Sequence, residues 1–121
     1  MNSIKYTVLM KSNPFLDYLI GDIFDEDLNV SARAMMGGHI LYSNGKVFAI
    51  AENDELWFKG TDELANWYLT RGSKKFSYMK EGKPQGMNYF LVPEEVIENK
   101  EALNEWLDVA LSVATIPKNK K

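Results

Sequence analysis

The sequence has no cysteine and only one histidine among its 121 residues. Without cysteine, neither disulfide bonds nor thiolate ligation of zinc or iron–sulfur clusters is possible, so stability must come from packing. A single imidazole, that of His39, offers little for metal chemistry. We therefore expect neither a metal ion nor a cofactor.

Long apolar stretches are also missing from the chain. No run of 18 apolar residues occurs, and residues 1–11 lack the cationic start and the continuous apolar stretch of a signal peptide. We expect a cytoplasmic protein with no membrane partner.

Basic residues do not outnumber acidic ones. Fourteen Lys and Arg residues stand against 17 Asp and Glu residues, which gives a formal net charge of −3. A dedicated binder of the nucleic-acid backbone usually carries a clear basic excess, so this balance argues against one. A local basic patch stays open as an alternative.

What the chain does contain is enough apolar material for one core, with 45% apolar and 12% aromatic residues. No linker, repeat or long charge block divides it, so one domain is expected over residues 1–121. Residues 1–12 form a flanking segment whose pattern fits both a strand and a helix, and they are left unassigned. Residues 117–121 are expected to form a flexible basic tail.

Two helices are indicated in the first 72 residues. Asn13 is a suitable N-cap and Pro14 suits the first helical position, because a proline lacks the N–H that would stay unpaired there. A second helix is predicted to begin at the N-cap Thr61 and to end at Gly72. The first helix carries an apolar stripe at helical spacing, formed by Leu16, Leu19, Ile20 and Ile23.

A third helix is predicted near the C-terminus, after a short acidic helical turn that Pro93 opens. Asn99 is its expected N-cap, and Pro117 prevents it from continuing. One face of this helix is apolar through Leu103, Trp106, Leu107, Ala110, Leu111 and Ala114.

Between Val30 and Lys59 the period changes to two, which is typical of strands. The pair Asn44-Gly45 is the strongest hairpin signal, because a type I′ turn needs positive φ at both central residues. We predict an antiparallel meander of four strands: Ser31–Met36, His39–Ser43, Lys46–Glu52 and Glu55–Lys59. In its third strand, simple alternation places Phe48 and Ile50 on one face and Val47, Ala49 and Ala51 on the other.

Two more strands are predicted at Lys75–Lys80 and Gly86–Val92, joined by a loop over Glu81–Gln85. The expected fold class is therefore α+β. It has two layers, with an antiparallel sheet of five to six strands, a meander plus a hairpin, packed by an N-terminal helix, a middle helix and a C-terminal helix.

Single residues with chemical potential are few. Arg33 could contact a partner or an anion, although a surface arginine with a packed stem is the plainer interpretation. His39 could act as a general base near neutral pH, yet no nucleophile or orienting partner is identifiable for it. Gly37-Gly38 lacks the setting of a phosphate-binding loop, so a tight turn is expected there. We therefore expect no enzyme.

A cluster of lysines is the other candidate site. Lys74, Lys75, Lys80 and Lys83 surround Phe76 and Tyr78, a combination that could grip single-stranded nucleic acid. The alternative is that the two rings cover the core and the lysines protect a sheet edge. The carboxylates at 25–27 and at Glu52, Asp54 and Glu55 lack calcium-loop spacing and are interpreted as solvated turns.

Several segments, in order, resemble the N-terminal domain of the TfoX (Sxy) competence-regulator family. The first half is carried by Ala32–Gly38, Leu41-Tyr42, Asn44-Gly45, Phe48-Ala49 and Leu56–Lys59. The second half is carried by Phe76–Tyr78, Met87–Tyr89, Val92–Glu95 and Glu105-Trp106. The resemblance spans about residues 14–114, and it departs from the family pattern at Ala34, Met36 and His39-Ile40.

This resemblance implies a two-layer α+β fold with an antiparallel sheet. It also implies an association with the regulation of DNA uptake genes. Full-length competence regulators carry a second, helical domain, and this chain is expected to be a stand-alone N-terminal domain without it; the sequence does not tell whether a separate chain supplies that domain.

The sequence is compatible with three functions. The first is a non-enzymatic regulatory or protein-binding module that works through a protein partner or through self-association as a homodimer, using a sheet edge or the terminal helix. The alternative is a transcription- or competence-associated nucleic-acid-binding protein, and the third is an enzyme of unknown class. No small-molecule ligand is inferred.

Overall fold

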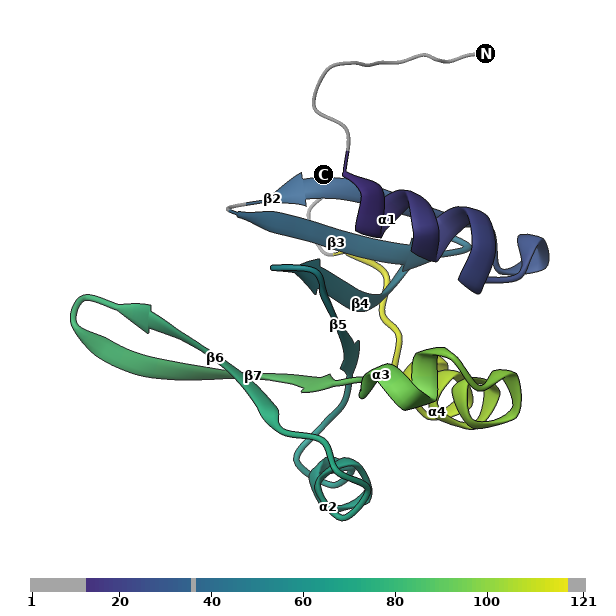
Figure 1. Cartoon of the computed structure of the whole chain (residues 1–121). Coiled ribbons are helices and arrows are strands. Elements are labelled where there is room, and N and C mark those ends of the chain that lie inside the picture. The colour runs from purple at the N-terminus through teal and green to yellow at the C-terminus, as the bar shows by residue number, and fades with distance from the viewer. Residues whose placement is uncertain (1–12, 36, 118–121) are drawn as a thin grey trace.

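The computed structural model describes residues 13–35 and 37–117 of the chain. Within these residues, six strands form one antiparallel sheet in the order β2-β3-β4-β5-β7-β6, as Figure 1 shows. They span Val30–Met35 (β2), Gly38–Ser43 (β3), Lys46–Glu52 (β4), Glu55–Lys59 (β5), Lys75–Lys80 (β6) and Lys83–Leu91 (β7). The predicted α+β class, with its meander and added hairpin, is confirmed. The expectations for residues 1–12 and for the tail beyond Pro117 lie outside the described residues.

Helical segments pack against one face of this sheet. They are α1 (Pro14–Tyr18), continued by a π-helical turn η1 (Leu19–Ile23), the 3₁₀ turn η2 (Glu26–Leu28), α2 (Ala65–Leu69), α3 (Glu94–Ile97) and α4 (Lys100–Ser112). Both predicted asparagine caps are confirmed: Asn13 Oδ1 accepts from the Leu16 N–H at 3.0 Å, and Asn99 Oδ1 accepts from the Ala102 N–H at 3.2 Å. No helix among the described residues has the length and apolar character to cross a membrane.

The middle helix is shorter than predicted. Thr61 Oγ1 does accept from the Leu64 N–H, at 3.2 Å, so the predicted cap forms. The backbone bonds of this first turn, from Leu64 N to Thr61 O and from Ala65 N to Asp62 O, join residues three apart. This is 3₁₀ geometry, and regular α2 begins only at Ala65.

Three of the hairpin turns consist of two residues that both have positive φ. These pairs are Asn44-Gly45 (51° and 83°), Asn53-Asp54 (55° and 58°) and Glu81-Gly82 (53° and 79°). Positive φ at both positions is the signature of a type I′ turn, whose twist matches that of the flanking strands. The Asn44-Gly45 prediction is therefore confirmed.

The predicted loop over Glu81–Gln85 is wrong, because Glu81-Gly82 alone forms the turn and β7 starts at Lys83. Pro84 lies inside this strand and pairs with Met79 of β6. A proline is tolerated in a strand where its missing N–H is not needed by a neighbour. That condition is met here because β5 pairs with β7 only from Tyr89 to Leu91.

The prediction of which side chains share a face of β4 is also wrong. Leu41 pairs with Ala49, but the next residue, Tyr42, pairs with Val47, so Phe48 is the extra residue of a β-bulge. A bulge shifts the alternation by one residue. Phe48 therefore joins Ala49 in the main core, whereas Ile50 packs on the opposite face.

The main core lies between the sheet and the helices and is rich in aromatic rings. Tyr68 of α2 stacks on Phe90 of β7 with centroids 4.7 Å apart and an angle of 7° between the ring planes. Trp106 of α4 meets the edge of Tyr68 at 5.5 Å. The Tyr68 hydroxyl donates to the Lys59 carbonyl at 2.8 Å. Tyr68 thus joins two helices to the centre of the sheet.

A smaller cluster covers the opposite face of the sheet where β4, β5, β6 and β7 meet. Trp57 and Phe76 meet edge to face at 4.9 Å, and both rings are at least nine-tenths buried. Ile50 and Tyr89 complete this second cluster, against which Met35, Val47, Met87 and Leu91 pack. It fixes the base of the β6–β7 hairpin to the rest of the sheet.

Gly60 offers a test of this packing. A Cβ at position 60 would lie 2.8 Å from Phe90 Cε1 and 2.9 Å from Tyr68 Cε2, both in buried rings. We expect Gly60→Ala to lower the free energy of unfolding by about 1 to 3 kcal/mol, the usual cost of overpacking. Gly21→Ala is the matched control, because nothing lies within 4 Å of a Cβ there and alanine favours a helical turn by about 0.5 to 1 kcal/mol. Urea unfolding measures both, and equal effects of the two changes would contradict the packing described.

The buried Tyr68 gives a pH-dependent prediction. Burial raises the pKa of its hydroxyl above the ordinary value of about 10, so the folded chain keeps a proton that the unfolded chain releases. Protonated Tyr68 makes its full contribution to the free energy of unfolding below about pH 10, and this contribution is lost as the pH rises further. Tyr68→Phe should cost about 0.5 to 1.5 kcal/mol at neutral pH through the lost hydrogen bond, and should weaken the alkaline decline in urea unfolding. An unchanged decline would show that Tyr68 is not its source.

Candidate functional site

Arg33 and His39 do not form a common site. Arg33 lies exposed on the edge strand β2 opposite Ile40, whereas His39 of β3 lies opposite Ala34 and Ala51, so their side chains point to opposite faces of the sheet. His39 Nδ1 is buried and has no hydrogen-bond partner within the described ranges. Residues 13–35 and 37–117 also contain no group of three or more His, Asp or Glu that could hold a metal ion.

The four candidate lysines lie in two places. Lys80 and Lys83 pair directly across the Glu81-Gly82 turn, at the tip of the β6–β7 hairpin. Lys74 and Lys75 lie at its base, where they line a hollow of about 400 Å³ together with Glu52 and Glu55. The predicted lysine cluster is therefore divided along the length of the hairpin.

The two rings between these lysines also differ in their surroundings. Phe76 is 8% exposed and packs in the second cluster, as the alternative interpretation of the sequence proposed. Tyr78 lies on the same face, with its ring centroid 6.4 Å from that of Phe76, but it is 40% exposed. One aromatic ring is thus available beside the lysines of the tip.

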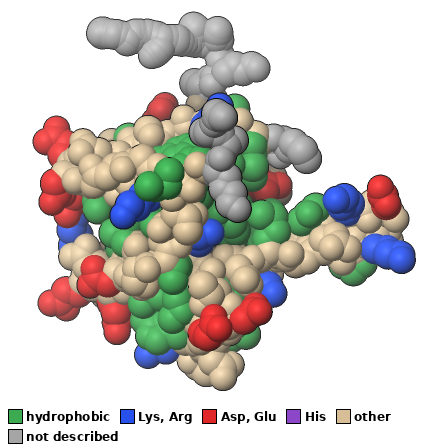
Figure 2. Space-filling model, turned by 180° about the vertical axis from the view of Figure 1, so that it is seen from behind, with side chains coloured by type: hydrophobic (Ala, Val, Ile, Leu, Met, Phe, Trp, Pro, Cys, Tyr) green, Lys and Arg blue, Asp and Glu red, His purple; other side chains and the backbone are tan. Residues whose placement is uncertain are grey.

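The outer part of this hairpin, residues 76–87, projects from the body of the protein, and we call it the hairpin arm (Figures 1 and 2). β7 pairs with β5 only through Tyr89–Leu91, so within residues 13–35 and 37–117 the arm is a ribbon of two strands with no third strand beside it. Met79 on the arm is 67% exposed, and Figure 2 shows basic and acidic side chains at its end.

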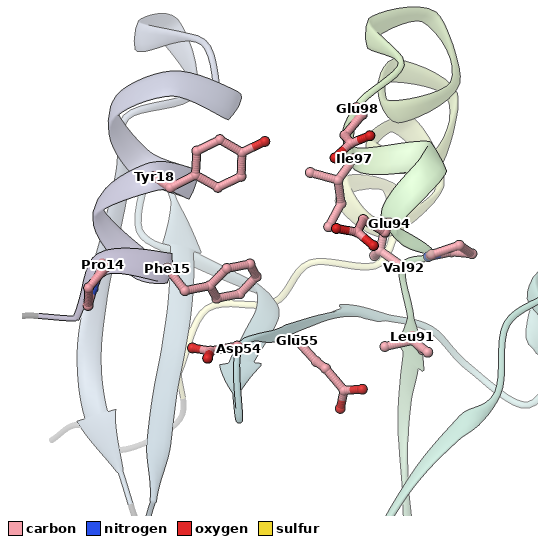
Figure 3. Close-up of a pocket in the computed structure, with 11 residues that line it drawn as sticks. Pro14, Phe15, Tyr18, Asp54, Glu55, Leu91, Val92, Glu94, Ile97 and Glu98 are labelled. Carbon is pink, nitrogen blue, oxygen red and sulfur yellow. The ribbon is translucent and has the colours of Figure 1, made fainter.

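A second feature, which we call the acidic groove, was not predicted from the sequence. It has a volume of about 770 Å³ and lies between three segments that are far apart in the chain. One wall is formed by Pro14, Phe15 and Tyr18 of α1, one end by Asp54 and Glu55 at the β4–β5 turn, and the other wall by residues 91–94, 97 and 98 of β7 and α3. In Figure 3 the rings of Phe15 and Tyr18 project from α1 towards α3.

Local structure explains how each segment reaches the groove. The Asn13 cap and Pro14 start α1 at the groove, and the type I′ turn at Asn53-Asp54 brings the Asp54 carboxylate to its end. On the opposite side the Val92 N–H still donates to Leu56 O of β5 at 2.8 Å, and Pro93 then turns the chain into α3. The helix cap, the type I′ turn and the turn at Pro93 are each common local structures. The groove exists only because the tertiary fold places these three segments next to one another.

The lining of the acidic groove combines apolar surface with negative charge. Val92 and Ile97 are buried in its wall at 2% and 8% exposure, whereas the carboxylates of Asp54, Glu94 and Glu98 remain exposed around it. Glu55 also lines the groove, but in Figure 3 its carboxylate points away from the space between α1 and α3. No lysine or arginine occurs among the described residues that line it. Asp54 and Glu55 are solvated, as predicted, but they belong to this groove and not to an isolated turn.

Such a surface suits a cationic side chain with an aliphatic stem. A lysine or arginine can place its stem against apolar walls and its charge beside carboxylates. An aromatic face such as that of Phe15 or Tyr18 adds a favourable cation–π contact of about 0.5 to 1 kcal/mol at an exposed site.

The tyrosines with raised pKa lie outside the acidic groove. Burial raises the pKa of Tyr68 in the main core. It also raises the pKa of Tyr89 in the second cluster, with a smaller contribution from Tyr42. Both groups are thus kept neutral by packing, and neither faces the acidic groove or the tip of the hairpin arm.

The comparisons with known proteins place the chain in a family. A search of curated proteins found no significant match. The family model of the TfoX N-terminal domain matches residues 22–114, which is most of the 121-residue chain. This match includes all six strands and two of the three segments that line the acidic groove, but α1 lies before its first residue. The chain therefore belongs to the TfoX N-terminal domain family.

Proposed function

We propose that this domain is a non-enzymatic regulatory module that binds protein, and that its acidic groove takes a short segment of a partner that carries lysine or arginine. One observation supports this proposal above all: the carboxylates of Asp54, Glu94 and Glu98 and two aromatic rings surround an apolar groove whose described lining has no basic side chain. A cationic segment would supply the charge that this lining lacks.

The size of the acidic groove favours a short segment. Its volume of about 770 Å³ falls in the usual range of roughly 300 to 1,000 Å³ for ligand sites, which admits a few side chains but not a folded domain. The described residues of its lining also include no histidine, lysine, serine or threonine, so none of them offers a nucleophile for acyl transfer or Schiff-base chemistry. Both points favour binding over catalysis.

The proposal predicts charge-selective peptide binding. A peptide of alternating lysine and leucine should bind the domain, and the same peptide with glutamine in place of lysine should not. Each exposed ion pair contributes about 0.2 to 1 kcal/mol, so the double change Glu94→Gln and Glu98→Gln should weaken binding about 2- to 30-fold. Isothermal titration calorimetry measures this, and added salt should weaken binding further.

The control is the double change Glu101→Gln and Glu105→Gln. It removes the same charge from exposed positions of α4 that do not line the acidic groove, so affinity should stay unchanged. If both double variants lost the same affinity for the peptide, binding would depend only on net charge, and the proposed site would be wrong.

A second candidate function, nucleic-acid binding, is favoured by the tip of the hairpin arm. Lys80 and Lys83 lie opposite each other there, and the exposed ring of Tyr78 could stack on a base. If this is the function, the protein should retard single-stranded DNA in a gel at low ionic strength, and added salt should reduce the shift. The double variant Lys80→Gln with Lys83→Gln should not retard the DNA. Absence of a shift at the lowest salt would exclude it.

A further inference from the structure

The hairpin arm leaves apolar and charged surface uncovered. A two-stranded hairpin is only marginally stable in water unless another element packs on it, and in the described part of the chain residues 76–87 pair only with each other. Its most exposed large apolar side chain is Met79, at 67%, and Tyr78 on the other face is 40% exposed. A partner that covered the tip would bury both.

The two faces of the tip differ in chemistry. Strand register places Lys80, its partner Lys83 and Tyr78 on one face, and Met79 with its partner Pro84 on the other. Two like charges directly opposite each other on a sheet repel. An anionic surface against this face would therefore reduce the repulsion between the two lysines and stabilise the tip. The carboxylate of Glu81 in the turn offsets only one of the two charges.

The acidic groove carries the complementary arrangement. Its exposed carboxylates, those of Asp54, Glu94 and Glu98, match the lysine face of the tip. Its apolar surface, formed by Phe15, Tyr18 and Ile97, matches the face of Met79 and Pro84. Both the charge and the apolar character of the tip therefore have counterparts in one site.

The arm cannot reach the groove of its own chain. In Figure 1 it extends to the left, away from α1 and α3, whose facing sides form the two walls of the groove. The second cluster holds its base in this direction through the contact of Trp57 with Phe76. A tip that enters an acidic groove must therefore come from another molecule.

We infer that two copies of this chain form a dimer by reciprocal exchange of their hairpin arms, with the tip of each arm seated in the acidic groove of the other copy. This inference rests on the proposed function, because it names the hairpin tip as the basic segment that the groove binds. In reciprocal exchange both tips fill both grooves within one closed, two-fold symmetric dimer. A single head-to-tail contact would leave one tip and one groove of the pair unoccupied. It differs from the pairing through a sheet edge or the terminal helix that the sequence suggested.

A charge-swap experiment tests the exchange. One variant carries Lys80→Glu and Lys83→Glu, and the other carries Glu94→Lys and Glu98→Lys. In each variant alone, arm and groove have like charges, so sedimentation equilibrium should give the mass of one chain where the unaltered protein gives that of two. In an equal mixture, the acidic arm meets the basic groove and the unaltered arm meets the unaltered groove, so the mass of two chains should return.

Controls separate this result from general effects of charge and folding. Glu101→Lys with Glu105→Lys makes the same charge change on α4 and should leave the dimer intact. All altered side chains are exposed, so circular dichroism and urea unfolding should show folded variants. Raising the salt from about 0.1 M to about 1 M shortens the Debye length from roughly 10 Å to 3 Å and should shift the unaltered protein towards one chain.

Several outcomes would overturn the inference. A single-chain mass for the unaltered protein, or a dimer that survives both charge-swap variants, would exclude arm exchange. If that single chain still bound the lysine peptide through Glu94 and Glu98, the proposed function would stand while the exchange failed. If the single chain also failed to bind the lysine peptide, both the proposed function and the arm exchange would be wrong. If Lys80→Glu with Lys83→Glu abolished DNA binding but left the mass unchanged, the arm would be a nucleic-acid surface.

Discussion

Three residue pairs join the two halves of the sheet: Trp57 with Leu91, Phe58 with Phe90 and Lys59 with Tyr89. This short junction is stabilised from both faces. On the helical face Tyr68 stacks on Phe90 and donates to the carbonyl of Lys59, and Gly60 leaves room for both rings. On the opposite face the indole of Trp57 packs against Phe76. Aromatic contact thus replaces the longer hydrogen-bonded ladder that the outer strands of the meander have.

Both surfaces that carry the functional proposals are consequences of this junction. On one side of it, residues 83–87 of β7 pair only with β6 among the described residues, which creates the hairpin arm. On the other side, Val92 keeps its bond to Leu56 and Pro93 then directs the chain into α3, which forms a wall of the acidic groove. A longer pairing of β5 with β7 would have absorbed the arm into the sheet.

Two described surfaces of opposite charge stand out on this member of the TfoX N-terminal domain family. The groove concentrates negative charge on apolar walls, and the arm concentrates positive charge beside Met79 and Tyr78. One wall of the groove comes from α1, which precedes the residues that the family model matches. The family assignment by itself therefore implies the sheet and its helices but does not imply the complete groove.

The sequence by itself determined those features that depend on a few neighbouring residues. Asn13 and Asn99 cap helices because their side chains accept from backbone N–H groups three residues further on, and Asn44-Gly45 turns because both residues tolerate positive φ. The strands of the meander and the family resemblance also followed from local patterns. These predictions succeeded because the physical cause and its effect lie within one short stretch of chain.

Only the tertiary structure decided the features that depend on distant neighbours. The bulge at Phe48 follows from its pairing with β3, and Pro84 is tolerated in β7 because β5 is not beside it. The acidic groove unites residues near positions 15, 54 and 94, which no local periodicity connects. Each of these outcomes is set by packing between segments, and the free energy of such packing is not encoded in any one of them.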